Sequence, residues 1–424
     1  MDPYRARLGF VNYGGPQSGS DSVNHDENHI ASIGTRSDSP KMGCADGPPN
    51  SQNLSGRGIT HPAWLEIDLD QFQRNLGAIR ERIGSRLLCL PVKANAYGHG
   101  LVPISLAAQE MGVDVLAVSC LKEGVCLRKA GIEIPILVFG AIHENQIDDL
   151  IDYTLEFSIS SQFKADLVAK KARGRQCRIH LEVDTGMHRT GVRPETALVL
   201  LERLRQQSTF VVAGVYSHLA TADEPEDPFA LEQIAVFEGL RTKVAEEGIV
   251  WHLANSGGVY FYPDSYFDMV RPGLLCYGLT PDGREDSAIR PIISLKARIS
   301  YFKVVAAGLG ISYGHLYRTK AQTRIVTVPI GYGDGYLSAL SNLAQVSIRG
   351  KLYPIAGRIC MDQFMVDIGM DEAYVGDEVV LIDGEPKSPL SLHNLARLAG
   401  VDPREIICRF NDRIERVYTD YRRS

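Results

Sequence analysis

The sequence of 424 residues lacks an apolar stretch of roughly 18 residues, about the shortest run that crosses a bilayer as a helix. It also lacks a signal-type apolar segment near Met1. Basic residues are not in excess, since 45 lysines and arginines stand against 51 aspartates and glutamates, which gives a net charge of −6. That balance offers no electrostatic footprint for nucleic acid or for an anionic membrane surface. We therefore expect a cytoplasmic protein that binds neither nucleic acid nor membrane and acts on a small molecule.

The eight cysteines lack the close pairing that marks structural zinc sites. Most of them lie inside apolar runs such as RLLCLPV and GLLCYG. We therefore expect buried free thiols in a reducing compartment and no metal site.

Residues 1–60 lack sustained hydrophobic periodicity, and more than half of them are Gly, Ser, Pro, Asn or Asp. Such a segment cannot bury enough apolar surface to offset the entropy of ordering it, so we expect a disordered N-terminal extension. Order is predicted to begin near Pro62, with an alternating segment around Trp64 followed by a helix whose apolar residues run from Leu69 to Ile83. Asp70, followed by Gln73, is the candidate cap of that helix.

Eight short β-rich runs separated by helix-like segments follow, up to about residue 280, and this alternation is typical of a (β/α)8 TIM-like barrel. An open doubly wound sheet is the alternative, but polar residues end all eight runs rather than one or two. After residue 290 alternating strands with glycine turns predict a mostly β domain. We predict an α/β protein with a barrel over residues 61–295, whose first strand is a candidate partner of the C-terminal domain, and a β-rich domain over 296–424.

In such a barrel the chemistry lies where the strands end. There the sequence places a lysine, carboxylates, arginines, a histidine and an Asn-Ser-Gly-Gly turn, at Lys93, Glu182, Asp184, Arg189, His218, Asn255, Ser256, Arg271 and Gly273. Taken singly, His218 is more typical of a buried structural histidine, and the arginines are as typical of surface ion pairs. Glycine and serine amides after the last two strands commonly bind phosphate in barrels. A lysine opposite such a cradle indicates pyridoxal phosphate held as a Schiff base.

Eight motifs occur in one order between Pro62 and Tyr418, and they resemble those of the alanine racemase family: VKANAYGHG, VDTGMHRTG, YSHLA, ANSGG, VRPGLLCYG, GISYGHLY, PIGYGDGY and GRICMDQFMVDI. The resemblance implies a barrel plus β domain, pyridoxal 5'-phosphate as cofactor, and a head-to-tail homodimer whose active sites are completed across the interface. It also implies an isomerase that interconverts L-alanine and D-alanine and supplies D-alanine for peptidoglycan.

Carried over by position, the resemblance assigns two catalytic bases, Lys93 on the cofactor and Tyr313 from the other subunit. It implies cofactor contacts at Lys93, Tyr97, His218, Asn255, Ser256, Arg271, Gly273, Leu274 and Tyr332. It implies substrate contacts at Arg189, Met361 and Asp362. Arg271 would face the ring nitrogen, and because a guanidinium stays protonated it can donate a hydrogen bond there without giving up its proton. His218 would bridge Arg271 and Tyr313.

The sequence departs from the family pattern at two positions. Glu182 stands where the family usually has a lysine, often carbamylated, and its shorter side chain puts the placement of Arg189 in question. Asp412 stands where some members place a tyrosine that contacts the phosphate, and an aspartate there would repel the phosphate.

Three other activities stay open from the sequence. The side-chain pocket is not legible from motifs, so a racemase for serine or basic amino acids is the main alternative. A decarboxylase of similar architecture and a noncatalytic pyridoxal phosphate binding protein are the others. The β domain with Tyr313 argues against the noncatalytic protein, which would resemble the barrel alone.

Overall fold

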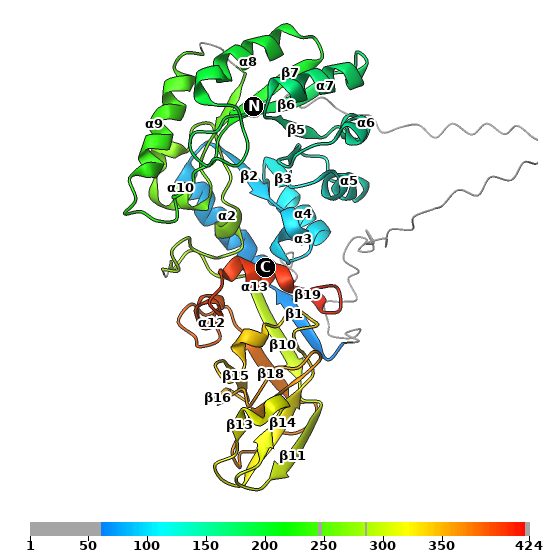
Figure 1. Cartoon of the computed structure of the whole chain (residues 1–424), viewed down its shortest axis with the longest axis vertical. Helices are drawn as coiled ribbons and strands as arrows, with labels where there is room; N and C mark the ends of the chain where they lie inside the picture. The colour runs from blue at the N-terminus through cyan, green and yellow to red at the C-terminus, as the bar shows by residue number, and fades with distance from the viewer. Residues whose placement is uncertain (1–60, 245–247, 285, 420–424) are drawn as a thin grey trace, which may run out of the picture.

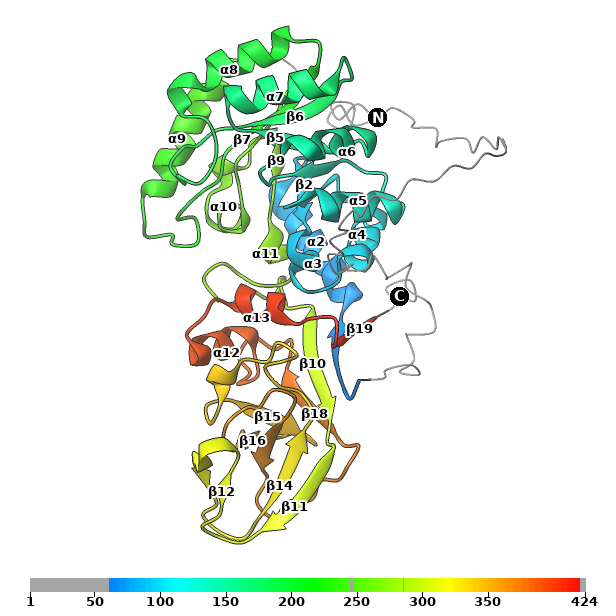
Figure 2. The same cartoon turned by 45° about the vertical axis from the view of Figure 1, so that its right-hand side comes forward.

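A computed structural model describes residues 61–244, 248–284 and 286–419 of the chain. The predicted N-terminal extension over residues 1–60 lies outside these described residues. Figures 1 and 2 show an elongated molecule with a barrel at one end and a mostly β region at the other.

Eight parallel strands close into a barrel, and most of their residues are buried and apolar, as expected of strands covered on both faces. They are β2 (Leu87–Pro91), β3 (Val115–Val118), β4 (Ile136–Val138), β5 (Glu156–Ile159), β6 (Cys177–Glu182), β7 (Phe210–Tyr216), β8 (Val250–His252) and β9 (Met269–Val270). The ladder runs in chain order and β9 pairs with β2, so the sheet has no free edge. The predicted barrel is confirmed, and an open doubly wound sheet is excluded.

Helices and short helical turns surround the barrel, and all but the first of them come after a barrel strand. They are α2 (Leu69–Ile83), α3 (Lys93–Tyr97), α4 (Leu101–Glu110), α5 (Leu121–Lys129), α6 (Ile147–Asp152), α7 (Gln162–Ala172), α8 (Pro194–Gln206), α9 (Phe229–Arg241), α10 (Ser256–Phe261) and α11 (Gly273–Cys276). The cap predicted for α2 was wrong. Asp68, in an extended conformation, accepts the N–H of Gln71, so the helix begins before Asp70 and places Asp70 in its first turn. None of the helices in the described ranges is long and apolar enough to cross a membrane.

Besides the side chains that pack in the main core, the barrel strands carry two other groups of buried residues. Apolar residues from β2, β3 and β4 form a cluster with Val250 and Met269. On β5, β6 and β8 the buried residues include Glu156, His180 and His252. Half of the barrel is therefore packed with hydrocarbon, while the other half carries polar groups that must find hydrogen-bond partners inside the protein.

The C-terminal region is mostly β, as predicted. Its strands are β10 (Ile293–Arg298), β11 (Tyr301–Val305), β12 (Gly310–Ile311), β13 (Tyr317–Arg318), β14 (Thr323–Val328), β15 (Gln345–Ile348), β16 (Lys351–Pro354), β17 (Phe364–Asp367), β18 (Glu378–Ile382) and β19 (Glu415–Tyr418). The largest sheet has the order β16-β15-β18-β10-β1-β19, where β1 is Ala63–Ile67. Strand β1 pairs antiparallel with β10 and parallel with β19, so the N-terminal strand joins the C-terminal sheet.

Two helices, α12 (Leu392–Ala399) and α13 (Pro403–Arg409), follow the last hairpins and return the chain to the barrel (Figure 2). Helix α13 packs against the turn after β2 at Gly98. A Cβ atom at Gly98 would lie 2.0 Å from the carbonyl oxygen of Ile407, and the φ of Gly98 is +81°. Only glycine allows this approach, which ties the mouth of the barrel to the C-terminal region.

Candidate active site

Lys93 follows strand β2 and opens a turn of unusual handedness. The next four residues, Ala94 to Tyr97, all have positive φ values between 51° and 56°. Non-glycine residues pay roughly 1 kcal/mol or more each for this conformation, so neighbouring groups must hold it in place. The N–H of Ala94 donates to Glu123 at 2.7 Å, and the Asn95 side-chain oxygen accepts the N–H of Leu101 at 2.7 Å. The strained turn fixes the lysine at the mouth of the barrel.

The amine of Lys93 is half-buried, and burial lowers its pKa below the ordinary value of lysine. The positive charge of Arg189 lowers this pKa further, while Glu123 opposes the change. A larger fraction of the amine is therefore neutral near pH 7 than for a lysine in water. A neutral amine can act as a nucleophile and as a base, whereas the amine of a surface lysine is almost entirely protonated near pH 7 and can do neither.

A serine and a glycine lie on the side of the mouth next to the lysine turn, since strand β9, which precedes the glycine, pairs with β2. The Ser256 hydroxyl oxygen accepts the N–H of Leu274 at 2.9 Å and that of Leu275 at 3.3 Å. A Cβ at Gly273 would lie 2.8 Å from the hydroxyl oxygen of Tyr97, so the tyrosine reaches the backbone of α11 only because residue 273 is glycine. The structure thus brings the hydroxyl groups of Tyr97 and Ser256 and the backbone at Gly273 to one side of the mouth.

Asn255 and His218 lie on the adjoining loops. The Asn255 amide donates to the carbonyl of Leu219 at 3.1 Å, which ties the loop after β8 to the loop after β7. Burial, together with the positive charge of Arg271, lowers the pKa of His218 to about 3. His218 is therefore neutral at physiological pH.

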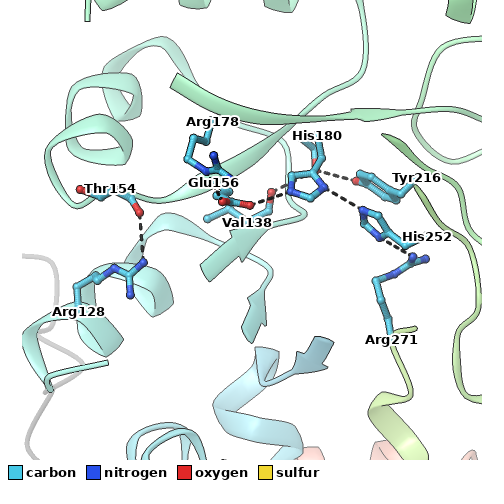
Figure 3. Close-up of polar contacts among 10 residues, drawn as sticks. Arg128, Val138, Thr154, Glu156, Arg178, His180, Tyr216, His252 and Arg271 are labelled. Carbon is cyan, nitrogen blue, oxygen red and sulfur yellow. Dashed lines mark hydrogen bonds and ion pairs between the residues drawn. The ribbon is translucent and has the colours of Figure 1, made fainter. Parts of the chain in front are cut away.

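Arg271 is buried and held at three points. Its Nη1 contacts Nδ1 of His252 at 2.8 Å, while Nη2 donates to the carbonyls of Ser217 at 2.7 Å and Leu253 at 3.1 Å. The histidine that contacts Arg271 in this structure is thus His252, which the sequence analysis did not single out (Figure 3). None of the acceptors bonded to Arg271 is a carboxylate. Within the described ranges, the hydrogen-bond partners of this guanidinium are therefore neutral acceptors.

Glu182 acts on the Arg189 loop through an intermediate residue. The buried Glu182 carboxylate accepts the hydroxyl of Thr190 at 2.6 Å, and burial raises the pKa of Glu182 above its usual range. The Glu182 carbonyl accepts the N–H of Val192 at 2.9 Å. Arg189 lies at the exposed tip of the loop that these two bonds close. Glutamate therefore holds Thr190, the residue next to the arginine.

The remaining predicted residues form a second group on the C-terminal region. Tyr313 follows β12 and is 71% exposed, Met361 is 54% exposed and Tyr332 is 49% exposed. The N–H of Tyr332 donates to the carbonyl of Cys360 at 3.1 Å, and Asp362 pairs with Arg413 at 2.9 Å. Strands β12 and β13, which flank Tyr313, lie at the end of the molecule away from the barrel (Figures 1 and 2).

One chain therefore brings together the barrel residues of the predicted site and leaves the C-terminal ones apart from them. None of the described hydrogen bonds joins Tyr313, Tyr332 or Met361 to Lys93. Asp412 is exposed in the segment after α13.

Sequence reasoning missed the buried polar residues Glu156, His180 and His252. A signal for two of them was present in the runs LEFSIS and RIHLEVD, where polar residues alternate with apolar ones. A parallel strand covered by helices is expected to be apolar on both faces, so a polar residue at every second position of such a run indicates a polar barrel interior.

The donor set fits a phosphorylated pyridine aldehyde. An amine of lowered pKa suits the aldehyde carbon, and the hydroxyls of Tyr97 and Ser256 beside the Gly273 backbone suit a phosphate. The fixed guanidinium of Arg271 suits an aromatic nitrogen acceptor. Pyridoxal phosphate has these three groups on one ring, and the residues present fit it.

Comparison with known proteins agrees with this geometry. The family model described as alanine racemase, N-terminal domain, matches residues 67–281, and the model described as alanine racemase, C-terminal domain, matches residues 292–418. The chain belongs to the alanine racemase family. The family predicted from the eight motifs is confirmed, and this family depends on pyridoxal phosphate.

Individual relatives match along nearly their whole length. The alanine racemase of Desulforamulus reducens is 38% identical over 374 residues, which are 85% of this chain and 100% of the relative. The crystal structure of alanine racemase from Streptomyces lavendulae is 36% identical with a TM-score of 0.79, over 85% of this chain and 97% of that one. The Bacillus anthracis alanine racemase with bound L-Ala-P is 33% identical with a TM-score of 0.79, over 85% of this chain and 96% of that one.

Proposed function

We propose that this protein interconverts L-alanine and D-alanine with pyridoxal phosphate, in the cytoplasm, and so supplies D-alanine for peptidoglycan. The observation that carries the proposal is the pairing of a match to alanine racemases over both regions with a lysine of lowered pKa at the end of the first barrel strand. The match to alanine racemases indicates the reaction, and Lys93 is the amine that this reaction requires.

Lys93 would hold the cofactor covalently, with Tyr97, Ser256 and the backbone of Gly273 and Leu274 around its phosphate. Asn255 and His218 would order the loops beside it, and Tyr332 would approach from the C-terminal region. When bound, pyridoxal phosphate withdraws electrons from the α-carbon of an attached amino acid and makes its proton acidic. Arg271 would donate a hydrogen bond to the ring nitrogen and would retain its own proton, because a guanidinium is not deprotonated in proteins.

Two bases move the proton. Racemisation requires that one base remove the α-proton from one face and that another acid return a proton to the opposite face. The amine of Lys93 serves one face, and the hydroxyl of Tyr313 serves the other. A tyrosine has a reference pKa near ~10, so it needs cationic neighbours to act as a base. Arg189 is the candidate to supply that charge.

Arg189, Met361 and Asp362 would receive the amino acid and border its entrance. A relative of known structure carries bound L-Ala-P, and an alanine racemase from Clostridium difficile was solved in complex with cycloserine. We extend binding of small amino acids from these relatives to this chain.

A homodimer completes the site in this proposal. Tyr313, Tyr332 and Met361 are exposed side chains on one chain, and none of their described contacts reaches Lys93. A tyrosine that must face the lysine across a substrate can then come from a second copy. Burial of these apolar side chains against the partner's barrel would also stabilise the association.

A substrate panel tests the proposed function. Racemisation of alanine, serine, lysine and arginine is measured in parallel, by the change of optical rotation, on the full chain loaded with pyridoxal phosphate. We expect alanine to give the highest kcat/KM. A serine value well above that for alanine would overturn the substrate assignment, and release of carbon dioxide would identify a decarboxylase.

A further inference from the structure

Four buried polar side chains form a continuous line through the interior of the barrel (Figure 3). Oε2 of Glu156 lies 2.8 Å from Nε2 of His180, and Nδ1 of His180 lies 2.9 Å from Nε2 of His252. Nδ1 of His252 lies 2.8 Å from Nη1 of Arg271. The line therefore connects strand β5 to strand β9 and ends at the arginine of the proposed active site.

The two ends of the line determine where its protons lie. A carboxylate can only accept, so Nε2 of His180 carries the proton that it donates to Glu156. An arginine can only donate, so Nδ1 of His252 carries no proton. A neutral His252 then carries its proton on Nε2, so it donates to Nδ1 of His180. One arrangement of protons satisfies all three contacts, and the reversed arrangement would place an N–H of His252 against an N–H of Arg271.

The negative charge of Glu156, at one end of the line, supports this direction of hydrogen-bond donation. Although burial opposes it, the hydrogen bonds from His180 and Arg178 lower the pKa of Glu156 to about 2, so its carboxylate is ionised. Nε of Arg178 donates to the other Glu156 oxygen at 2.7 Å. Burial and the charge of Arg271 hold the pKa of His252 well below its ordinary value, so this ring is neutral.

A glycine opens the path between the two histidines. Strand β7 runs between the strands of His180 and His252, and it carries Gly214 opposite His180. A Cβ at Gly214 would lie 2.4 Å from Nδ1 of His180, the atom that accepts from His252. The ladder also shifts register between Ile179 and His180, which is the mark of a bulge that re-aims a side chain. Any side chain at position 214 would displace the ring.

We propose that Glu156 is a positioning residue for the reaction: through His180 and His252 it fixes the proton pattern that makes His252 an acceptor for Arg271. Gly214, which has no side chain, leaves the space that the ring of His180 occupies in this line. The inference rests on the proposed function, because it is there that Arg271 faces the ring nitrogen of the cofactor. Glu156 touches neither cofactor nor substrate and acts only by orienting the guanidinium.

Nitrogen NMR of the full chain, with 15N-labelled histidine, tests the proton pattern without any assay of activity. Difference spectra of His180→Gln and His252→Gln assign the two rings. We expect the proton on Nε2 of each ring and a bare Nδ1, in the cofactor-free and the loaded protein. In Glu156→Gln the amide can donate as well as accept, so we expect a mixture of proton patterns. A proton on Nδ1 of His252 in the unsubstituted protein would overturn the inference.

Two further variants test the consequence for Arg271. We expect Glu156→Gln and Gly214→Ala each to weaken pyridoxal phosphate binding and to lower kcat by about tenfold, as for a buried polar contact left unsatisfied. The matched control is Ser158→Ala, because Ser158 lies on the same strand as Glu156 and bonds the hydroxyl of Tyr216 at 2.7 Å rather than the histidine line. We expect the control to leave the proton pattern of the line unchanged and to lower cofactor affinity and kcat less than Glu156→Gln does.

Equal cofactor affinity and kcat in Glu156→Gln and Ser158→Ala would overturn the positioning role. If Gly214→Ala does not fold, the isosteric Glu156→Gln and the NMR spectrum of the unsubstituted chain still decide. Failure of the proposed function shows separately, as absence of alanine racemisation in the unsubstituted protein, and it leaves the NMR result unaffected.

Discussion

The mouth of the barrel and the Tyr313 face of the C-terminal region carry the two halves of one predicted site, yet they differ in completeness. At the mouth, Lys93 is half-buried on a turn braced by Glu123, and Arg271 is held by three hydrogen bonds. On the other face Tyr313 is 71% exposed. Side chains that are fixed by contacts within their own chain can already have a reactive geometry in a single subunit. Exposed side chains lack such contacts until another surface packs against them. In the homodimer that we propose, assembly as well as folding would complete the site.

Replacement of the lysine should have the largest effect on the barrel half. We expect Lys93→Ala to lower alanine racemisation by more than about a thousandfold, because it removes both the covalent link to the cofactor and one base. It should also abolish the visible absorbance of the bound cofactor. Lys122→Ala, an exposed lysine on the neighbouring α5, is the matched control and should keep both properties. An unchanged spectrum in Lys93→Ala would refute the cofactor assignment.

Mixed dimers would sharpen the contrast between the two halves. We expect Tyr313→Phe to keep the cofactor absorbance and to lose racemisation. Coexpression of Lys93→Ala and Tyr313→Phe chains with different tags allows purification of dimers that contain one of each. Such a dimer should recover about half of the unsubstituted activity, because one of its two sites holds an intact lysine and an intact tyrosine.

The control for this experiment is Tyr301→Phe, another exposed tyrosine of the same region, which should keep full activity. If the mixed dimer is as inactive as either parent, Tyr313 acts on the Lys93 of its own chain, and the comparison fails.

The junction between the halves can be weakened at Gly98. We expect Gly98→Ala to lower the free energy of unfolding by about 2 to 4 kcal/mol, because a Cβ would collide with the Ile407 carbonyl at a positive φ. Gly112→Ala is the matched control, since φ there is +78° and nothing lies within 4 Å of the added Cβ. It should cost only about 1 kcal/mol. Thermal unfolding measures both, and equal shifts in Tm would show that helix α13 does not brace the barrel mouth.

The lowered pKa of Lys93 predicts a smaller change in pH dependence. The rate at which cofactor-free protein captures pyridoxal phosphate should rise with pH to a midpoint below the ordinary lysine pKa near ~10.4, because the neutral amine reacts. Arg189→Gln should move the midpoint upward, since it removes a positive charge that lowers this pKa. Arg193→Gln, on the same loop, should leave the midpoint unchanged. A midpoint that does not move in Arg189→Gln would place this arginine away from the lysine.

The barrel was predictable because short, mostly apolar runs recur along the chain between helix-like segments. The residues that follow these runs are the ones that lie at the mouth of the barrel. The cap of α2 at Asp68 was not predictable, since Asp68 and Asp70 are both acceptable caps. In the structure Asp68 accepts the N–H of Gln71, and its own N–H donates to the carbonyl of Ile292, which lies far along the chain. The line of hydrogen-bonded side chains from Glu156 to Arg271 was also not predicted. Its members are scattered over the sequence, and only barrel closure brings them within hydrogen-bond distance.

Glu182 illustrates the same division. The sequence shows a glutamate where the family usually has a lysine, but it does not show what a shorter side chain would contact. In the structure the carboxylate bonds the hydroxyl of Thr190, and so reaches the Arg189 loop through a neighbour.

By itself the sequence determined the family, the alternation of strands and helices, and the lysine at the end of a strand, because these depend on local pattern and on residue type. Only the tertiary structure decided which histidine meets Arg271, which glycine opens the path to it, and which catalytic candidates one chain leaves exposed. These outcomes depend on distances between residues far apart in the chain, and hydrophobic periodicity carries no record of such distances.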